Sequence, residues 1–285
     1  MNEEKRMTAP VPSVGADEGQ SLTNTTDSIT DEEAEYKENL RRMWELQRLS
    51  DPSYLNTFSM NELYDKTFPS RPPLIDGLLP SGTYFLAGAP KVGKSFLVAQ
   101  IAYHVSTGQT LWNYPVQQGG VLYLALEDDQ RRLQGRMSRM FGVEGTDDLN
   151  FAIYSGQVGA GLETQLDNYL REHPGTKLVI IDTLQKIRGD TGDAYSYSAD
   201  YKVIGQLKQF ADTKSISLLL VHHTRKQQAD DKFDMISGTN GLLGASDGGF
   251  LLSKEKRTSN KALLEIAGEE QEKQEIGRAS CRERV

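Results

Sequence analysis

Eight consecutive residues carry the strongest chemical signal in the sequence. They are Gly88, Ala89, Pro90, Lys91, Val92, Gly93, Lys94 and Ser95, and they match the pattern G-x-x-x-x-G-K-[ST] without a gap. Glycines let backbone N–H groups and a helix N-terminus face phosphate groups. We expect Lys94 to neutralise the β and γ phosphates of ATP and Ser95 to bind Mg²⁺. The alternative is a glycine-rich turn that contains a lysine by chance.

A second signal is a carboxylate at the end of an apolar segment. KLVIID (177–182) has four apolar residues followed by Asp182, which is the Walker B pattern. We expect the Asp182 carboxylate to hold the Mg²⁺ ion, through water. A strand that ends in Asp is also often a turn or a helix cap, so this pattern gains its meaning from the glycine-rich loop.

Hydrolysis of a triphosphate also requires a group that orients the attacking water. VLYLALEDD (121–129) places Glu127, Asp128 and Asp129 at the carboxyl end of an apolar strand, the edge at which ligands bind in open α/β sheets. Glu127 is the first polar residue after the strand, and we expect it to be the general base. Asp128 or Asp129 is expected to cap the next helix.

LLLVHH (218–223) brings two histidines to the same edge. We favour His223, which lies later on the strand than His222, as the group that hydrogen-bonds the γ phosphate and senses its loss. The alternative is a histidine of the core whose ring nitrogens are hydrogen-bonded there and which has no role in catalysis. The two residues belong to no HExxH or cysteine pattern, so they do not indicate a metal site.

Three further features follow the expected strands. Segments 187–202 and 225–241 are polar, contain glycine and are longer than most connections; they could line a channel for nucleic acid or be surface loops. Lys254, Lys256 and Arg257 carry enough charge to reach a nucleotide on a neighbouring subunit. We choose Arg257 for that role, and a solvated hairpin tip is the alternative.

Alternating apolar and amphipathic segments are expected to position these groups. Apolar runs predict strands at 83–89, 119–126, 149–155, 177–182 and 216–223, and a hairpin at 248–255 and 261–268. Amphipathic runs predict helices at 94–108, 128–142, 162–173 and 197–215. Strands that are almost wholly apolar and alternate with helices indicate a parallel sheet covered on both faces. The expected fold is therefore three-layer α/β, with a mostly parallel central sheet and a C-terminal hairpin.

The N-terminal region differs in composition. Residues 1–30 are acidic and poor in large apolar groups, so we expect a disordered tail. Residues 31–49 have acids first, arginines last and one apolar face, which predicts a helix that packs on the core or on a neighbouring subunit. Prolines and glycines from 68 to 82 interrupt regular structure, so 31–73 is interpreted as a helix and linker.

Composition narrows the function classes. The net charge is -8, with an excess of acidic residues in 1–50 and again in 51–275. This distribution does not support a broad basic face that binds nucleic acid. A few basic loops could still bind a phosphate backbone. No segment is long and apolar enough to span a membrane, and the first residues lack a secretory pattern. With Cys281 as the single cysteine, we expect a soluble, cytoplasmic protein.

The chain resembles the RepA-like group of RecA-fold ATPases, relatives of the hexameric replicative helicases of plasmids and mobile elements. The resemblance extends from about Leu74 to Gly268, through LIDGLLPSGTYFLAGAPKVGKS, VLYLALEDD, LVIIDTLQKIRG, LLLVHHTRK and SGTNGLLGASDGGFLL. It implies a RecA-like core over 74–275, a hexameric ring with ATP between subunits, and movement on single-stranded DNA. It also implies the family roles of five residues: Lys94, Ser95, Glu127, Asp182 and His223. Related rings act as loaders, recombination proteins or clock ATPases.

The last ten residues, IGRASCRERV (276–285), resemble the translation of a common sequencing adapter. We expect that this segment is not native and that the natural protein continues beyond about Glu275. The alternative is a native basic tail that binds an anionic partner.

The sequence is consistent with two functions. The first is a DNA-stimulated, ring-forming Mg-ATPase, a helicase for replication of a mobile element. The second is a nucleotide-dependent regulator or loader that acts on a partner protein without unwinding. Stimulation of ATPase activity by single-stranded DNA would separate them.

Overall fold

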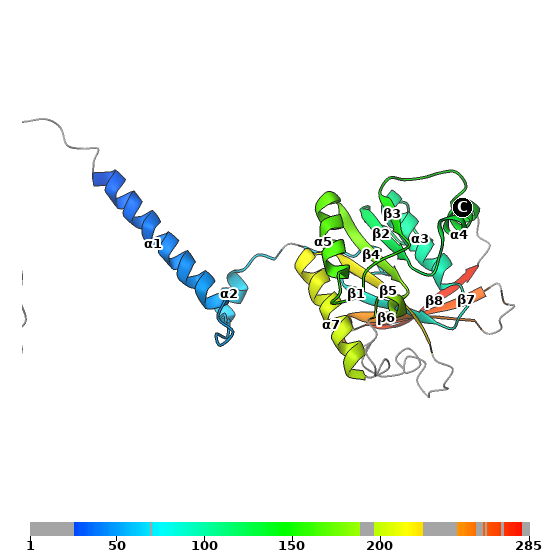
Figure 1. Ribbon diagram of the computed structural model, residues 1–285. Helices are drawn as coiled ribbons and strands as arrows, with labels where there is room; N and C mark the ends of the chain where they lie inside the picture. Colours follow the sequence, from blue (N-terminus) through cyan, green and yellow to red (C-terminus); the bar gives the residue numbers. More distant parts are fainter. Residues whose placement is uncertain are drawn as a thin grey trace, which may run out of the picture. The chain divides into compact units, whose positions relative to one another are not determined.

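The computed structural model describes residues 26–68, 70–188, 197–224, 244–254, 259, 261–268 and 271–280. The chain divides into two compact units, Met1–Pro69 and Ser70–Val285 (Figure 1).

The first unit contains helices α1 (Thr26–Leu49) and α2 (Met60–Asp65). Helix α1 begins five residues earlier than the sequence pattern predicted, and its large apolar side chains, such as Met43 and Trp44, are exposed. Helix α2 was not predicted. Its N-terminus is a capping box, in which the Ser59 hydroxyl accepts the Glu62 N–H and the Glu62 carboxylate accepts the Ser59 N–H.

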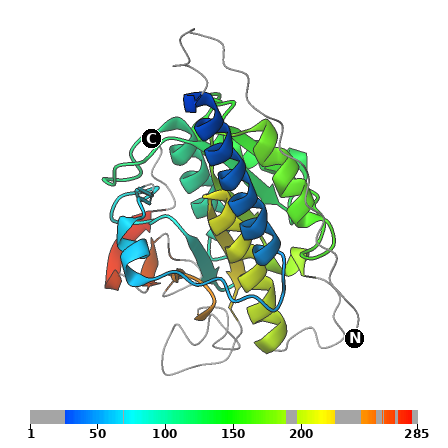
Figure 2. The ribbon, with the colours of Figure 1, turned by 90° about the vertical axis from the view of Figure 1, so that its left-hand side faces the viewer.

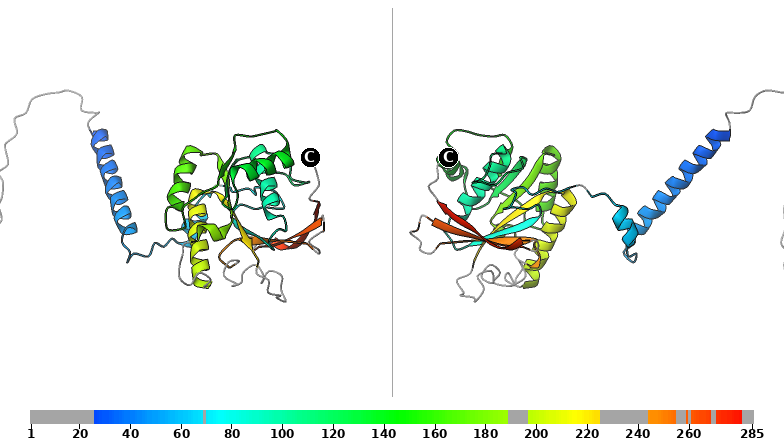
Figure 3. Two further views of the ribbon diagram at one scale, coloured as in Figure 1. Left: turned by 45° about the vertical axis from the view of Figure 1, so that its right-hand side comes forward. Right: turned by 180° about the vertical axis from the view of Figure 1, so that it is seen from behind.

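One eight-stranded sheet forms the centre of the second unit, in the order β3-β2-β4-β5-β1-β6-β7-β8. The strands are β1 (Thr83–Gly88), β2 (Gly120–Ala125), β3 (Leu149–Ala152), β4 (Thr176–Asp182), β5 (Ser217–His223), β6 (Gly248–Ser253), β7 (Lys261–Gly268) and β8 (Gln271–Ser280). Strands β1 to β6 are parallel to one another, whereas β7 and β8 pair antiparallel at one edge, orange to red in Figure 3. The predicted hairpin is thus β6–β7, and β8 is an additional strand.

Helices cover both faces of this sheet. The apolar cluster on one face includes residues of α3 (Lys94–Thr107) and α4 (Gln130–Phe141). The cluster on the other face includes residues of α5 (Leu162–Glu172), α6 (Leu184–Ile187) and α7 (Tyr197–Lys214), and Figure 2 shows α5 and α7 side by side. The predicted three-layer α/β fold is confirmed.

Strand order brings the chemical groups to one edge of the sheet. Strand β4 lies between β2 and β5, and β5 lies beside β1. Residues Ala125 and Asp182 are paired in register at the ends of β2 and β4, and Gly88 and His223 are paired at the ends of β1 and β5. Because all four strands are parallel, their carboxyl ends share the edge where ligands bind in open α/β sheets.

Candidate functional site

The loop after β1 depends on glycine at two positions. A Cβ atom on Gly88 would lie 2.5 Å from the carbonyl oxygen of Leu252, far inside normal contact distance. Gly93, which precedes the first residue of α3, has a φ of 115°, a left-handed conformation that favours glycine. Gly88 thus lets the end of β1 approach the backbone of β6 closely, and Gly93 lets the loop lead directly into the N-terminus of α3, where free N–H groups favour anions.

Lys94, the first residue of α3, lies at the centre of the site and is only 5% exposed. Its Nζ donates to the carbonyl oxygens of Gly88 (2.7 Å) and Ala89 (3.1 Å). Nζ also lies 3.0 Å from Nδ1 of His223. Burial lowers the pKa of Lys94 to about 8, while the negative charges of Asp182 and Glu127 oppose that shift. The ammonium is therefore held beside the loop and is incompletely compensated there.

Asp182 ends β4 and is 4% exposed. The Tyr123 hydroxyl donates to its Oδ2 at 3.0 Å, and the Ser95 side chain also hydrogen-bonds the carboxylate. Burial raises the pKa of Asp182, and these two hydrogen bonds act in the opposite direction. A hydroxyl from the glycine-rich loop and a carboxylate from β4 are thus brought together.

Glu127 follows β2 and is half exposed, so its carboxylate can reach solvent. Its Oε1 accepts a hydrogen bond from the Thr183 hydroxyl at 3.1 Å and lies 3.7 Å from Nε2 of His223. The Leu126 N–H donates to the Asp182 carbonyl oxygen at 2.8 Å, which joins the ends of β2 and β4. Glu127 is therefore positioned across the site from Lys94.

The two acids after Glu127 have other contacts. Asp128 accepts two hydrogen bonds from the Arg136 guanidinium, at 2.6 and 3.2 Å, and both side chains are largely buried. Asp129 is the N-cap of α4 and accepts the Arg132 N–H at 2.8 Å. The geometry thus separates the three consecutive acids, and it assigns the expected helix cap to Asp129.

In the described part of the chain, Tyr123 and Thr183 hydrogen-bond the acids of this site and Arg136 binds the neighbouring Asp128, and none of the three was predicted from the sequence. Tyr123 is the one hydroxyl-bearing residue in the apolar strand β2, and Thr183 directly follows the Walker B aspartate. Each of these features could have indicated from the sequence that the residue contacts the site. Arg136 carried no such signal, because it is one of four arginines in α4.

Several predicted residues lie outside the described part of the chain. They are Lys256, Arg257, segment 225–241 and residues 189–196 of the other polar segment. Lys254 directly follows β6 and is partly exposed. The roles proposed for these groups stay predictions.

The donor set suits a magnesium nucleotide. Ser95 and Asp182 supply hard oxygen donors, and Mg²⁺ is commonly held by one or two protein oxygens together with phosphate and water. Among the described residues, no cluster of three or more His, Cys, Asp or Glu side chains could hold a metal by itself. An ion here would therefore depend on the nucleotide for its remaining ligands.

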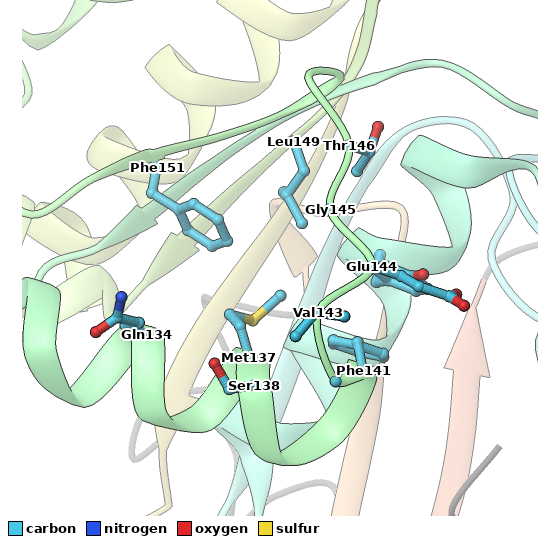
Figure 4. Close-up of a pocket in the computed structure, with 12 residues that line it drawn as sticks. Gln134, Met137, Ser138, Phe141, Val143, Glu144, Gly145, Thr146, Leu149 and Phe151 are labelled. Atoms are coloured by element: carbon cyan, nitrogen blue, oxygen red, sulfur yellow. The ribbon is translucent and has the colours of Figure 1, made fainter.

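A separate hollow lies between α4 and the edge strand β3. Met137 and Phe141 of α4 face Leu149 and Phe151 of β3 across it (Figure 4). Its lining includes none of the residues from Gly88 to Ser95 and none of the acids or histidines named above. The hollow is thus distinct from the site at the strand ends.

In the described ranges, no helix has the length and apolar character that a bilayer crossing requires.

Comparison with known proteins gives relatives of several kinds. The RadA protein of Synechocystis, named a DNA repair protein, is 26% identical over 212 residues, which are 70% of this chain and 39% of RadA. The chain thus spans well under half the length of this relative. A solved structure described as an ATPase domain superposes with a TM-score of 0.56 at 15% identity, over 84% of this chain and 93% of that one. A DnaB-like replicative helicase gives a TM-score of 0.57 at 15% identity, over 89% and 72%.

These structural similarities establish the fold, the three-layer α/β arrangement of RecA-like P-loop domains. A family model described as an AAA domain, AAA_25, matches residues 49–229 and so covers more than half of the chain, including the loop, both acids and His223. The chain belongs to this AAA domain family.

Proposed function

We propose that the chain binds Mg-ATP at the end of β1 and hydrolyses it. The observation that supports this most directly is the convergence of Lys94, Asp182, Glu127 and His223 around the glycine-rich loop, from four different elements. Lys94 would exchange its two carbonyl contacts for the β and γ phosphates of ATP. Ser95 and Asp182 would hold Mg²⁺, which neutralises developing charge on the phosphates.

Glu127 is the proposed base that orients the attacking water. It is the exposed acid of the group, and its neighbours Thr183 and His223 restrict where its carboxylate points. His223 lies between Lys94 and Glu127, so a γ phosphate bound to Lys94 would come within its reach. We therefore propose His223 as the group that senses whether the γ phosphate is present.

At the level of the whole protein, we propose a cytoplasmic, ring-forming motor that acts on single-stranded DNA, a helicase for replication of a mobile element. Support comes from the fold shared with the DnaB-like helicase and from the match to RadA, whose name places it in DNA repair. A hexamer with ATP between subunits, and Arg257 as a trans group, belong to the same proposal.

One observation favours a second function. Residues 51–275 carry an excess of acidic over basic residues, which suits a regulator or loader that acts on a protein partner. ATPase rates should be measured with and without single-stranded DNA, and the mass of the protein should be measured with and without ATP. The motor predicts strong stimulation and an ATP-dependent ring. An ATPase that DNA leaves unchanged would exclude the motor and support the regulator.

A further inference from the structure

Tyr123 is a buried phenol in an apolar strand. It lies in the middle of β2, where its neighbours in the strand are aliphatic, and it is 0% exposed. A phenol hydroxyl that is withdrawn from water requires a hydrogen-bond partner. Here the partner is Oδ2 of Asp182, 3.0 Å away. Phenylalanine would fill the same space without that requirement, so the hydroxyl calls for an explanation beyond packing.

The sheet register explains how a residue inside β2 reaches the end of β4. Tyr123 is paired with Ile180, and Asp182 lies two residues further along β4. Residues two apart in a strand are on the same face, roughly 6.6 Å apart, which is about the reach of a tyrosine side chain. The Tyr123 ring also packs against Phe151 on the neighbouring strand β3, with ring centroids 5.7 Å apart. The ring is thus fixed from one side while its hydroxyl points along the sheet.

The Asp182 carboxylate has hydroxyl partners on two different elements. Tyr123 approaches from the core, and Ser95 approaches from the glycine-rich loop. A carboxylate can rotate about its last bond, and each rotation changes which oxygen faces the loop. A donor fixed on one oxygen removes that freedom. The arrangement therefore holds Asp182 in one orientation before any ligand arrives.

We propose that Tyr123 is a positioning residue, whose hydroxyl orients the Asp182 carboxylate toward Ser95 and the magnesium ion of the bound nucleotide. This inference rests on the function proposed for the same site. It assigns to β2 a second role, in addition to carrying Glu127. Tyr123 does not contact the nucleotide; its effect passes through Asp182.

The hydroxyl can be removed without loss of the ring by the substitution Tyr123→Phe. Tyr103→Phe is a matched control, because Tyr103 is also buried and ring-packed, stacked on Phe141 at 4.0 Å, but lies in the wall of the separate hollow. Binding of a non-hydrolysable ATP analogue should be measured by calorimetry, once with Mg²⁺ and once with EDTA. The ratio of the two affinities reports the contribution of the metal.

We expect Tyr123→Phe to reduce that ratio by about fivefold to tenfold, the effect of one typical intramolecular hydrogen bond. Affinity in EDTA should stay within about twofold of wild type, and Tyr103→Phe should change neither value. In an Asp182→Ala background, Tyr123→Phe should have no further effect, because the group through which it acts is gone.

Three results would overturn the proposal. They are an unchanged ratio in Tyr123→Phe, an equal loss of affinity with and without Mg²⁺, and a loss of the folded circular-dichroism spectrum, which would make the hydroxyl a requirement of the core. A folded wild-type protein that does not bind the magnesium analogue would instead remove the proposed function.

Discussion

The two sides of the candidate site are built differently. The phosphate side is one continuous segment, Gly88 to Ser95, between β1 and α3. The acidic side is assembled from the ends of β2 and β4, where the contact between Glu127 and Thr183 joins residues 56 positions apart in the sequence. One side is specified by local backbone conformation, and the other exists only when the sheet is formed.

Exposure also differs among the charged groups, and the acidic side contains both a buried and an exposed carboxylate. Lys94 and Asp182 are nearly buried, at 5% and 4%, whereas the Glu127 side chain is 46% exposed. Buried charges with several hydrogen bonds are costly to disturb, and an exposed carboxylate is free to meet water. This difference suggests that binding and hydrolysis can be separated by substitution.

The largest effect is expected for Lys94→Ala. The variant loses charge-assisted contacts to the phosphates, each of which contributes about 1.5–3 kcal/mol. Nucleotide affinity should fall at least about 100-fold, and turnover should be lost. Lys202→Ala is the control, because Lys202 is an exposed lysine of α7, outside the phosphate-binding loop, and calorimetry should find its affinity close to that of wild type. Equal affinities for wild type and Lys94→Ala would contradict the role assigned to the phosphate side.

Glu127→Gln should separate hydrolysis from nucleotide binding. Loss of a general base lowers turnover by about 10²–10⁴-fold, while nucleotide affinity should stay within about threefold of wild type. Turnover is measured by phosphate release, and Glu144→Gln, at an exposed position on the loop after α4, serves as the control. A Glu127→Gln protein that hydrolyses ATP normally would move the base elsewhere.

Asp128→Asn tests whether the neighbouring acid is structural. Its bidentate contact with Arg136 is largely buried, and loss of one charge leaves the guanidinium poorly compensated. We expect unfolding free energy to fall by about 1–3 kcal/mol in denaturant titration and turnover to fall less than tenfold. Asp129→Asn should change little, because asparagine also caps helices well. A stable but inactive Asp128→Asn variant would contradict this assignment.

A smaller effect is expected at Thr183. Thr183→Val removes the hydroxyl that donates to Glu127, so turnover should fall about threefold to tenfold with little change in affinity. Thr183→Ser keeps the donor and should retain most of the activity. If steady-state kinetics showed the serine and valine variants to be equally impaired, the methyl group rather than the hydroxyl would matter.

The smallest expected effect is the uptake of protons when the nucleotide binds. Because burial lowers the pKa of Lys94 to about 8, part of the lysine is neutral above that pH in the free protein. Bound phosphates stabilise the ammonium, so nucleotide binding near pH 8.5 should take up a fraction of a proton, and affinity should decline as pH rises further. Calorimetry in buffers of different ionisation enthalpy measures this uptake, and Lys94→Ala should abolish the lysine contribution to it. Uptake that is the same at pH 6.5 and 8.5 would contradict the lowered pKa.

Much of the fold could be predicted because it is encoded in local patterns. The almost wholly apolar strands β1, β2, β4 and β5 indicated a sheet buried on both faces, and the structure has this sheet. Strand β8 and helix α2 could not be predicted in the same way. The polar sequence QEKQEIGRAS has no strand periodicity, and its pairing with β7 comes from the neighbouring strand. Helix α2 is short and depends on its capping box.

The candidate site was predictable in parts. The residues of the phosphate side are contiguous, so their spacing alone was informative. Glu127 and Asp182 were identified from their positions at the ends of apolar strands. This rule predicts the edge of the sheet at which a residue lies, but it does not predict the residue's contacts. Tyr123 and Arg136 act through partners 59 and 8 positions away. Their contacts depend on strand register and on the direction of α4, which single-residue patterns do not contain.

The most direct test of nucleotide binding is calorimetric titration of the folded wild-type chain with a non-hydrolysable magnesium ATP analogue. We expect saturable binding of one nucleotide per chain, which weakens strongly in Lys94→Ala and persists in Glu127→Gln. A well-folded wild-type protein that releases or absorbs no heat with the analogue across several temperatures would contradict this expectation.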